Sequence, residues 1–293
     1  MPDSKCPLCH ATQSQRLFSV GSHDLLSCDV CELIYIWPYP QDSGQVYDSV
    51  SDYKYDDLEI MSAETHFESS KLAYARIYPH IRPYYQTADA TLDVGCGTGY
   101  LLDQLREFPQ LKRVGIELNV PRAAFARRAA ECDVYEQPVQ QFDTDQRFDV
   151  ITMIAVFSHA PDFAGLYSSL RNLLTPNGKL ILHVGEFARN VKRNAVFDWE
   201  VPDHLHFMGL KTAQYLADHF GYKIVHHYRE PLADLIFART TWRAPGRSAA
   251  RNRIKRLVTL TPGALTLLKS IYKLRHGTSI YNSIIVFERT EMG

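Results

Sequence analysis

A short glycine-rich segment between a predicted strand and a predicted helix constrains this fold more than any other feature. Residues 91–94 form the apolar run of a short buried strand, and residues 100–108 have an amphipathic helical pattern that ends before Pro109. Between them are three glycines, Gly95, Gly97 and Gly99. Their G-x-G-x-G spacing is tighter than that of a dinucleotide site. Glycines permit a sharp turn and close approach of the backbone to a ligand, so we predict a ligand-binding loop.

A carboxylate on the next predicted strand supports this interpretation. That strand covers residues 113–118 and ends near Glu117, twenty-two residues after Gly95. A carboxylate at a strand tip beside the glycine loop can accept hydrogen bonds from both ribose hydroxyls of an adenosine. The loop and the acid together therefore predict a nucleoside-containing ligand at one edge of a sheet.

The rest of the chain alternates strand-like and helix-like segments, as a doubly wound α/β fold does. Residues 148–155 are almost continuously apolar, which is typical of a parallel strand buried on both faces. Further strands are predicted at 133–136, 179–185, 222–228 and 281–289. Helices are predicted at 121–130, 162–174 and 211–220.

In this order the motifs resemble those of a class I S-adenosylmethionine-dependent methyltransferase. The resemblance is carried by "LDVGCGTGY", Glu117, "FDVI" and "LTPNGKLIL", and it covers roughly residues 80–230 and 281–289. It implies a Rossmann-like class I methyltransferase sheet in which the glycine loop holds the methionine part of S-adenosylmethionine. Glu117 would hold the ribose, Asp93 would support the loop, and the adenine would lie near Phe142, between Gln141 and Asp143. The implied cofactor-binding residues are Asp93, Gly95, Gly97, Gly99, Glu117 and Phe142.

Two cysteine pairs near the N-terminus have metal-binding spacing. They are Cys6 with Cys9 and Cys28 with Cys31. Each C-x-x-C places two sulfurs on one tight turn, and the eighteen residues between the pairs fit a four-cysteine zinc ribbon. Four thiolates leave Zn²⁺ no open position for water, so we predict a structural zinc and not a catalytic one. The two remaining cysteines, Cys96 and Cys132, are expected to be unligated.

The predicted ribbon is acidic, with a net charge of −3 over residues 1–44. Phosphate binding needs clustered Lys and Arg, so this negative charge argues against binding of the ribbon to nucleic acid. We expect the following stretch, "LIYIWPYPQ", to pack on the neighbouring domain or to line a substrate entrance. A four-cysteine ribbon ahead of such a domain resembles bacterial small-molecule methyltransferases. The resemblance implies methyl transfer to oxygen or carbon of a small or carrier-bound metabolite, such as a sugar, natural product or surface-glycan precursor.

We predict three parts of the chain: a zinc ribbon at 1–45, a linker and helical lid at 46–80, and the S-adenosylmethionine-binding domain at 81–293. A helical insertion at 231–280 precedes the last strand and contains ten Lys or Arg residues against Asp234 alone. Two interpretations stay open for it. One is a solvated helical cover. The other is a surface for an anionic acceptor or for an anionic membrane, contacted peripherally through residues 251–276. The residues to neutralise first in a test of such a surface are Arg251, Arg253, Lys255 and Arg256.

Three histidines are candidates for the catalytic base: His159, His204 and His206. His159 follows the fourth strand of the domain, at the carboxyl edge where open α/β sheets bind ligands. His204 and His206 follow the fifth strand, and their H-L-H alternation places both on one side of an extended segment. Methyl transfer depends mainly on alignment, but a base assists when the acceptor is a hydroxyl or an acidic C–H. Structural roles are the alternative, and a second metal site is not favoured because no further ligand has the right spacing.

Two other functions stay open. "CPLCH" also resembles the zinc-binding start of a bacterial ribosomal-RNA guanine methyltransferase, although the acidic ribbon and the second C-x-x-C count against an RNA-base methyltransferase. A non-catalytic zinc-stabilised scaffold is the other, against which the intact glycine loop and Glu117 argue. No apolar run reaches the ~18 residues of a membrane span, and the N-terminus lacks the order of a signal peptide. We therefore expect a cytoplasmic enzyme without a transmembrane segment.

Overall fold

The computed structural model describes residues 4–40, 63–195, 199–236, 258, 261–276 and 280–291. Its strands are β1 (Ser14–Val20), β2 (His23–Cys28), β3 (Ile34–Trp37), β4 (Ala90–Val94), β5 (Lys112–Ile116), β6 (Asp133–Tyr135), β7 (Phe148–Ile154), β8 (Leu174–Phe187), β9 (His206–Gly209), β10 (Tyr222–Pro231) and β11 (Ile280–Arg289). Its α-helices are α2 (Ala63–Ile81), α3 (Tyr100–Gln104), α4 (Val120–Ala130), α5 (Phe163–Leu173), α6 (Thr212–Phe220), α7 (Leu232–Ile236) and α10 (Ala264–His276).

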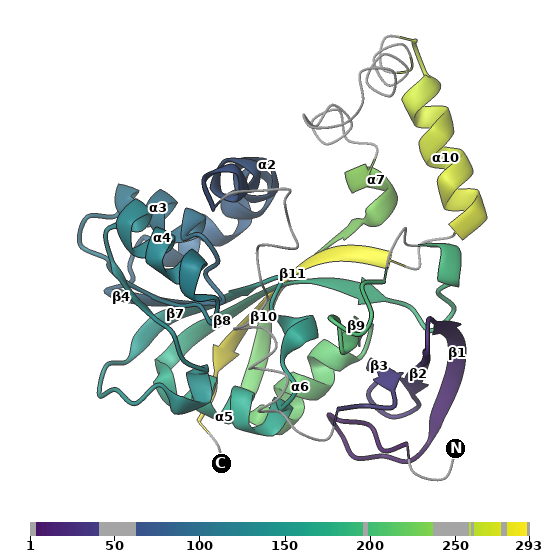
Figure 1. Cartoon of the computed structure of the whole chain (residues 1–293), viewed down its shortest axis with the longest axis horizontal. Helices are drawn as coiled ribbons and strands as arrows, with labels where there is room; N and C mark the ends of the chain where they lie inside the picture. The colour runs from purple at the N-terminus through teal and green to yellow at the C-terminus, as the bar shows by residue number, and fades with distance from the viewer. Residues whose placement is uncertain are drawn as a thin grey trace.

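One hydrogen-bonded sheet runs through the described part of the chain (Figure 1). Its centre is the parallel order β6-β5-β4-β7-β8. The last strand, β11, is inserted antiparallel between β8 and β10. Helices α3 and α4 lie over one face of this sheet, and α5 and α6 lie over the other (Figure 1). The predicted α/β fold with a Rossmann-like class I methyltransferase sheet is therefore confirmed.

The central strands and the apolar faces of the helices form the core because their apolar side chains pack against each other. Every residue of β4 is buried, as expected for the middle strand of a sheet covered on both faces. On α5 the buried side chains, spaced three or four residues apart, are Phe163, Leu166, Tyr167, Leu170 and Leu173. Asp162 caps this helix by accepting a hydrogen bond from the Gly165 amide at 3.0 Å. Buried residues of β4 and α5 thus belong to one core cluster.

Three local predictions differ from the structure. The helix expected at 100–108 is shorter, because α3 ends at Gln104 and a 3-10 turn over Leu105–Glu107 follows. Strand β8 begins at Leu174, five residues before the predicted start of this strand at residue 179. Strand β9 was not among the predicted strands. Its four residues form a strand because β3 and β8 supply hydrogen-bond partners that the local sequence does not reveal.

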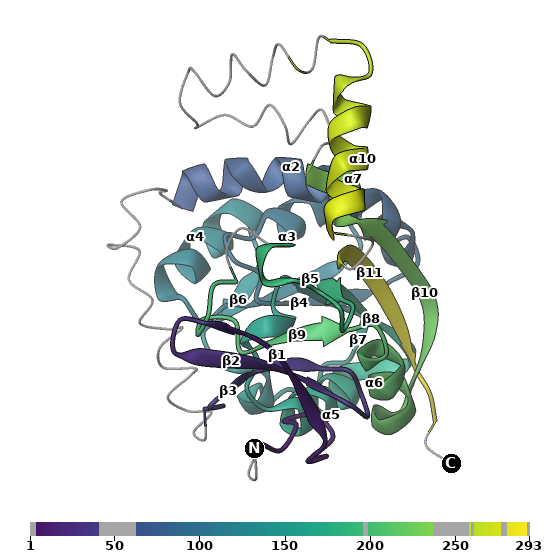
Figure 2. The ribbon, with the colours of Figure 1, turned by 90° about the vertical axis from the view of Figure 1, so that its right-hand side faces the viewer.

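The N-terminal strands pair into the central sheet. β1, β2 and β3 form an antiparallel unit, and β3 pairs with β9 through Ile34 with Phe207 and Tyr35 with His206. The Ile36 amide donates to the Leu205 carbonyl at 3.0 Å. Figure 2 shows β1 to β3 beside β9 at one end of the molecule. The described residues of the aromatic stretch therefore pack on the neighbouring domain, which is the first of its two expected roles.

The insertion before β11 is described only in part. Helices α7 and α10 belong to it, and Asp234 on α7 forms ion pairs with Lys269 and Lys273 on α10. The Tyr272 hydroxyl donates to the Ala195 carbonyl at 2.8 Å, which ties α10 to the domain. The basic residues chosen for neutralisation lie outside the described residues; they are Arg251, Arg253, Lys255 and Arg256. No helix within the described ranges is long and apolar enough to cross a membrane.

Candidate active site

A cavity of about 490 Å³ opens at the carboxyl ends of β4, β5 and β7. Its walls come from those strand ends, from α2, and from the turn that precedes β9. Ligands bind at this edge in open α/β sheets, because the loops there converge on one crevice. The glycine loop, Glu117 and two of the candidate histidines all line this cavity.

Two glycines of the loop have distinct steric roles. Gly95 has φ +71°, and a Cβ at this position would lie 2.3 Å from Cγ2 of Val156, so a larger residue would push the loop away from β7. Gly97 has φ +55° and lines the cavity, where an added Cβ would meet nothing closer than the His66 ring at 3.8 Å. The absence of a side chain there keeps the cavity open beside the loop backbone. Gly99 immediately precedes α3 and is packed against Ala126.

Glu117 is held in a defined orientation at the end of β5. One carboxylate oxygen accepts a hydrogen bond from the Gly97 amide at 2.8 Å, and the other accepts from the Asn119 amide at 2.9 Å. The residue is only 7% exposed, and this burial raises the pKa of its carboxyl group. The acid thus links the glycine loop to β5 and presents its oxygens, which retain lone pairs, at the cavity wall.

Asp93 lies beneath the loop, on β4, and is not part of the cavity wall. One of its oxygens accepts a hydrogen bond from the Thr152 hydroxyl at 2.6 Å. The other oxygen has no hydrogen-bond partner among the described residues. Burial of this carboxyl group raises its pKa to about 7. An unsatisfied buried carboxylate next to the loop suits a ligand that carries positive charge.

The raised pKa of Asp93 predicts how stability depends on pH. Unfolded aspartate has a pKa of about 3.9, so between that value and about 7 the folded protein binds a proton that the unfolded chain does not. This stabilisation is present at low pH and is lost as pH rises through the folded pKa. From about pH 6 to about pH 8 it contributes a fall of about 1.4 kcal/mol in the free energy of unfolding. Asp93→Asn should remove that part of the fall, measured by urea denaturation; an unchanged pH dependence would contradict the assignment.

Of the residues near the expected adenine position, some line the cavity and others do not. Phe142 follows a 3-10 turn over Val139–Gln141 and does not line the cavity; its ring lies 4.9 Å from that of Tyr135. Val139 and Gln140, from the turn itself, line the cavity instead. The resemblance implies an adenine position close to this turn, and only the structure shows which residues of the turn face the cavity.

Two of the candidate histidines meet at the cavity wall. His159 ends a 3-10 turn after β7, and His204 lies in the turn before β9. Their ring centroids are 4.7 Å apart and both rings line the cavity. Nδ1 of His159 donates a hydrogen bond to the Asp203 carbonyl at 3.1 Å, and Nε2 of His204 lies 3.4 Å from the Glu200 carboxylate. Burial, and next the nearby His204, lower the pKa of His159.

His206 lies in the core, outside the cavity wall. Its Nε2 donates to the Phe157 carbonyl at 2.5 Å, and its ring packs against Phe163. Burial lowers its pKa to about 3. The expected alternation does not place it beside His204, because the extended segment begins only at His206, where β9 pairs with β3.

Sequence reasoning missed several residues of the cavity wall. His66 on α2 contacts the Thr98 hydroxyl at 3.2 Å, and Arg122 comes from α4. His183 lines the cavity from β8, and burial lowers its pKa to about 4. A polar residue that interrupts the apolar run of β8 is a signal that could have revealed His183. No local signal identifies His66, because packing of α2 brings it to the loop.

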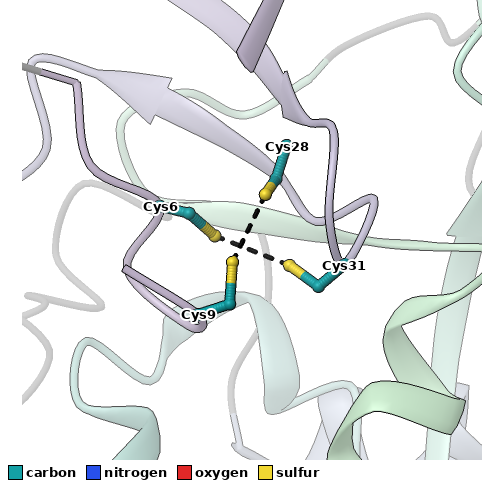
Figure 3. A group of neighbouring side chains, drawn as sticks. All are labelled: Cys6, Cys9, Cys28 and Cys31. Carbon is teal, nitrogen blue, oxygen red and sulfur yellow. Dashed lines mark hydrogen bonds between the residues drawn. The ribbon is translucent and has the colours of Figure 1, made fainter. Parts of the chain in front are cut away.

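The four N-terminal cysteines converge on one point (Figure 3). Sγ of Cys6 lies 3.6 Å from that of Cys31, and Sγ of Cys9 lies 3.4 Å from that of Cys28. All four sulfurs lie within 4.8 Å of one another. A tetrahedral zinc site with Zn–S bonds of about 2.3 Å has S···S edges of about 3.8 Å, so the cluster has nearly the size that such a site needs. Cys6 and Cys9 lie at the turn before β1, whereas Cys28 ends β2 and Cys31 follows it. All four are remote from the glycine loop in sequence.

The comparisons with known proteins agree with this geometry. A family model described as "Methyltransferase domain" matches residues 66–227, more than half of the chain. Ubiquinone biosynthesis O-methyltransferase of Histophilus somni (strain 2336) is 33% identical over 105 residues, which cover 32% of this chain and 44% of that protein. The tRNA U34 carboxymethyltransferase of Aliarcobacter butzleri (strain RM4018) is 30% identical over 112 residues, covering 36% of this chain and 37% of that one. The chain therefore spans less than half the length of each of these two relatives.

The similar solved structures share the fold. Geranyl diphosphate C-methyltransferase from Streptomyces coelicolor A3(2), in complex with Mg²⁺, geranyl diphosphate and S-adenosyl-L-homocysteine, has a TM-score of 0.56 at 15% identity and covers 86% of this chain and 100% of that one. A putative sarcosine dimethylglycine methyltransferase from Galdieria sulphuraria has a TM-score of 0.53 at 13% identity, with 84% and 96% covered. The chain belongs to the methyltransferase-domain family, and its similarity to these structures confirms the predicted class I fold.

Proposed function

We propose that this chain transfers a methyl group from S-adenosylmethionine to an oxygen or carbon atom of a small or carrier-bound metabolite. One observation carries the proposal: a single cavity contains the glycine loop with Glu117 and, in the same wall, the His159–His204 pair. A donor held by the first group and an acceptor held by the second would share that cavity. Such juxtaposition supplies much of the rate of a group transfer that needs alignment of nucleophile, methyl and leaving group.

The donor side has the chemistry that S-adenosylmethionine requires. The cofactor, when bound, supplies a methyl group on a positively charged sulfur. The Glu117 carboxylate would accept hydrogen bonds from the ribose hydroxyls, and the open space at Gly97 would admit the methionine part close to the backbone. Asp93, with one oxygen unsatisfied among the described residues, would offset positive charge near the loop. Val139 and Gln140 are the better candidates for the adenine contact than Phe142, because they line the cavity.

The acceptor side is proposed to be the wall formed by His159 and His204. Their role would be to promote loss of the proton from an acceptor hydroxyl or acidic C–H as the methyl group arrives. His206 is assigned a structural role instead, because it is fully buried and bonded to the Phe157 carbonyl. The role of His206 is to join β9 to the turn that contains His159.

We propose a small or carrier-bound metabolite, and not RNA, as the acceptor. Relatives named as an O-methyltransferase and as sterol 24-C-methyltransferase support oxygen or carbon as the target atom. The relative named tRNA U34 carboxymethyltransferase supports RNA as the competing acceptor. Against RNA stands the net charge of −3 over residues 1–44, since phosphate contacts need clustered cations. We also propose that the four cysteines hold a structural Zn²⁺, which their sulfur spacing supports.

Isotope transfer tests the proposal. Binding of S-adenosylhomocysteine is measured first by calorimetry, and labelled methyl from S-adenosylmethionine is then followed into metabolite, carrier-protein and RNA fractions of a bacterial extract. We expect cofactor binding and label in the metabolite or carrier fraction. Gly97→Val, whose side chain would enter the cavity, should abolish both signals while thermal unfolding stays cooperative. Label in RNA would replace the proposed acceptor class, and failure to bind S-adenosylhomocysteine would favour a non-catalytic scaffold.

A further inference from the structure

The acceptor wall contains a second cluster of metal-ligating side chains, separate from the cysteines. His159, Asp203 and His204 each offer a ligand atom, and these atoms lie within 4.8 Å of one another. All three residues line the cavity. They come from two segments, the turn after β7 and the turn before β9. Two imidazoles and one carboxylate are a known ligand set for divalent first-row transition metals, and three protein ligands leave positions open for water or substrate.

The two segments are bound to each other by their backbones, so the cluster is held together without a ligand. The Leu205 amide donates to the Ser158 carbonyl at 2.9 Å, between the neighbours of the two histidines. The His204 amide donates to the Glu200 carbonyl at 2.8 Å and closes the turn. A site built on backbone contacts of this kind keeps its ligand atoms in place.

The hydrogen bond of His159 also suits a metal ligand. Its Nδ1, which lies 3.8 Å from the Asp203 carboxylate, donates to the Asp203 carbonyl at 3.1 Å, so the lone pair of the ring is on Nε2. Metal-bound histidines almost always donate their other ring N–H to a carbonyl or carboxylate, because this orients the ring and makes the ligand nitrogen more basic. The Glu200 carboxylate, 3.4 Å from Nε2 of His204, adds a further acid beside the cluster.

We propose that His159, Asp203 and His204 bind a divalent first-row transition metal cation that holds an oxygen of the methyl acceptor. The inference deepens the proposed function and rests on it for the role of the cation, but metal binding itself does not depend on methyl transfer. The ligand set excludes Mg²⁺ and Ca²⁺ as preferred ions, since those take oxygen ligands, and favours Zn²⁺, Co²⁺, Fe²⁺ or Mn²⁺. Open positions on such an ion fit an acceptor with two neighbouring oxygens, such as a vicinal diol or a hydroxy acid.

The chemistry balances without a further reactant. A hydroxyl oxygen bound to the cation becomes more acidic and releases its proton to water. The oxygen attacks the methyl carbon, the bond between that carbon and sulfur breaks, and its electron pair stays on sulfur. The products are a methyl ether, S-adenosylhomocysteine and one proton. The His159–His204 pair thereby promotes proton loss through the cation and does not itself accept the proton.

Metal binding to the full-length protein tests the inference directly. The protein is saturated with Zn²⁺ and desalted, and its zinc content is measured by mass spectrometry; Co²⁺ is titrated separately, in the absence of S-adenosylmethionine. We expect two equivalents of Zn²⁺, one for the cysteine cluster and one for the histidine cluster. Asp203→Asn and His204→Gln should each reduce zinc to one equivalent and weaken the second Co²⁺ affinity by at least about 100-fold. His219→Gln, on the exposed side of α6, is the matched control and should keep both.

The outcomes separate this inference from the proposed function. Cobalt in the histidine cluster should show weak visible bands without the intense near-ultraviolet absorption of cobalt–thiolate bonds, so the two sites are distinguished in one titration. A second equivalent that survives both Asp203→Asn and His204→Gln would be adventitious, and binding of one equivalent only would also overturn the site. In either case intact S-adenosylhomocysteine binding would leave the proposed function standing. If the wild type did not bind S-adenosylhomocysteine, the proposed function would be wrong, whereas the proposed metal site would stand.

Discussion

Replacing Glu117 by alanine should weaken S-adenosylmethionine binding by roughly 100-fold, or about 3 kcal/mol. Two hydrogen bonds from ribose hydroxyls to a carboxylate contribute about that much, since bonds to charged acceptors are each worth ~1.5–3 kcal/mol. The substitution would also remove the acceptor of the Gly97 amide, which helps to hold the glycine loop. Calorimetry with S-adenosylmethionine and with S-adenosylhomocysteine measures the change.

Glu117→Gln is the matched variant for this prediction. It keeps the size of the side chain and one acceptor oxygen, so its loss of affinity should be nearer tenfold. Binding of Co²⁺ at the His159, Asp203 and His204 cluster should be unchanged in both variants, because Glu117 takes no part in that cluster. If Glu117→Ala bound the cofactor as tightly as the wild type, the ribose would lie elsewhere in the cavity.

Replacing Cys6 by serine should cost the protein one equivalent of zinc and weaken acceptor binding about tenfold, while S-adenosylhomocysteine affinity stays within about twofold. Structural zinc contributes ~10–16 kcal/mol to the folding of small zinc domains, so loss of one thiolate should release β1 to β3. Two backbone hydrogen bonds connect β3 to the acceptor wall. The Ile36 amide on β3 bonds to the Leu205 carbonyl, and the Leu205 amide bonds to the Ser158 carbonyl next to His159.

Hydrogen–deuterium exchange gives the residue-level measurement for this variant. Exchange should accelerate at Ile36 and Leu205 and stay slow in β4 and β5, whose partners lie in the centre of the sheet. Cys132→Ser is the control, because this cysteine lies outside the cluster of four. Equal loss of cofactor and acceptor binding in Cys6→Ser would mean that the ribbon supports the whole domain, and unchanged zinc content would contradict the proposed site.

The part of the cavity that we propose for the donor could be predicted as a ligand-binding loop because its signals are local. A strand, three glycines at fixed spacing and an acid at the next strand end occupy one short run of sequence, and each residue type has a steric or hydrogen-bonding reason to be there. The four-cysteine spacing is local in the same sense. The structure adds that Gly95 faces Val156 and that Asp93 is buried beneath the loop.

The acceptor half was only partly predictable. His159 and His204 were candidates from their positions after strands, but Asp203 had no distinguishing pattern, and a metal site was disfavoured because sequence spacing alone offered no third ligand. The three proposed ligands lie together because a backbone hydrogen bond joins Leu205 to Ser158, 47 residues apart in the chain. His206 looked equivalent to His204 in sequence, and pairing of β9 with β3 buried it.

By itself, then, the sequence determined the class of fold, the donor loop with Glu117, and the cysteine cluster, because periodicity and close spacing act over a few residues. Only the tertiary structure decided which histidines face the cavity, that α2 brings His66 to the loop, and that the ribbon's β3 pairs with β9. These features depend on hydrogen bonds and packing between segments far apart in the chain. Such contacts exist only once the sheet has formed, and no local pattern of residues encodes them.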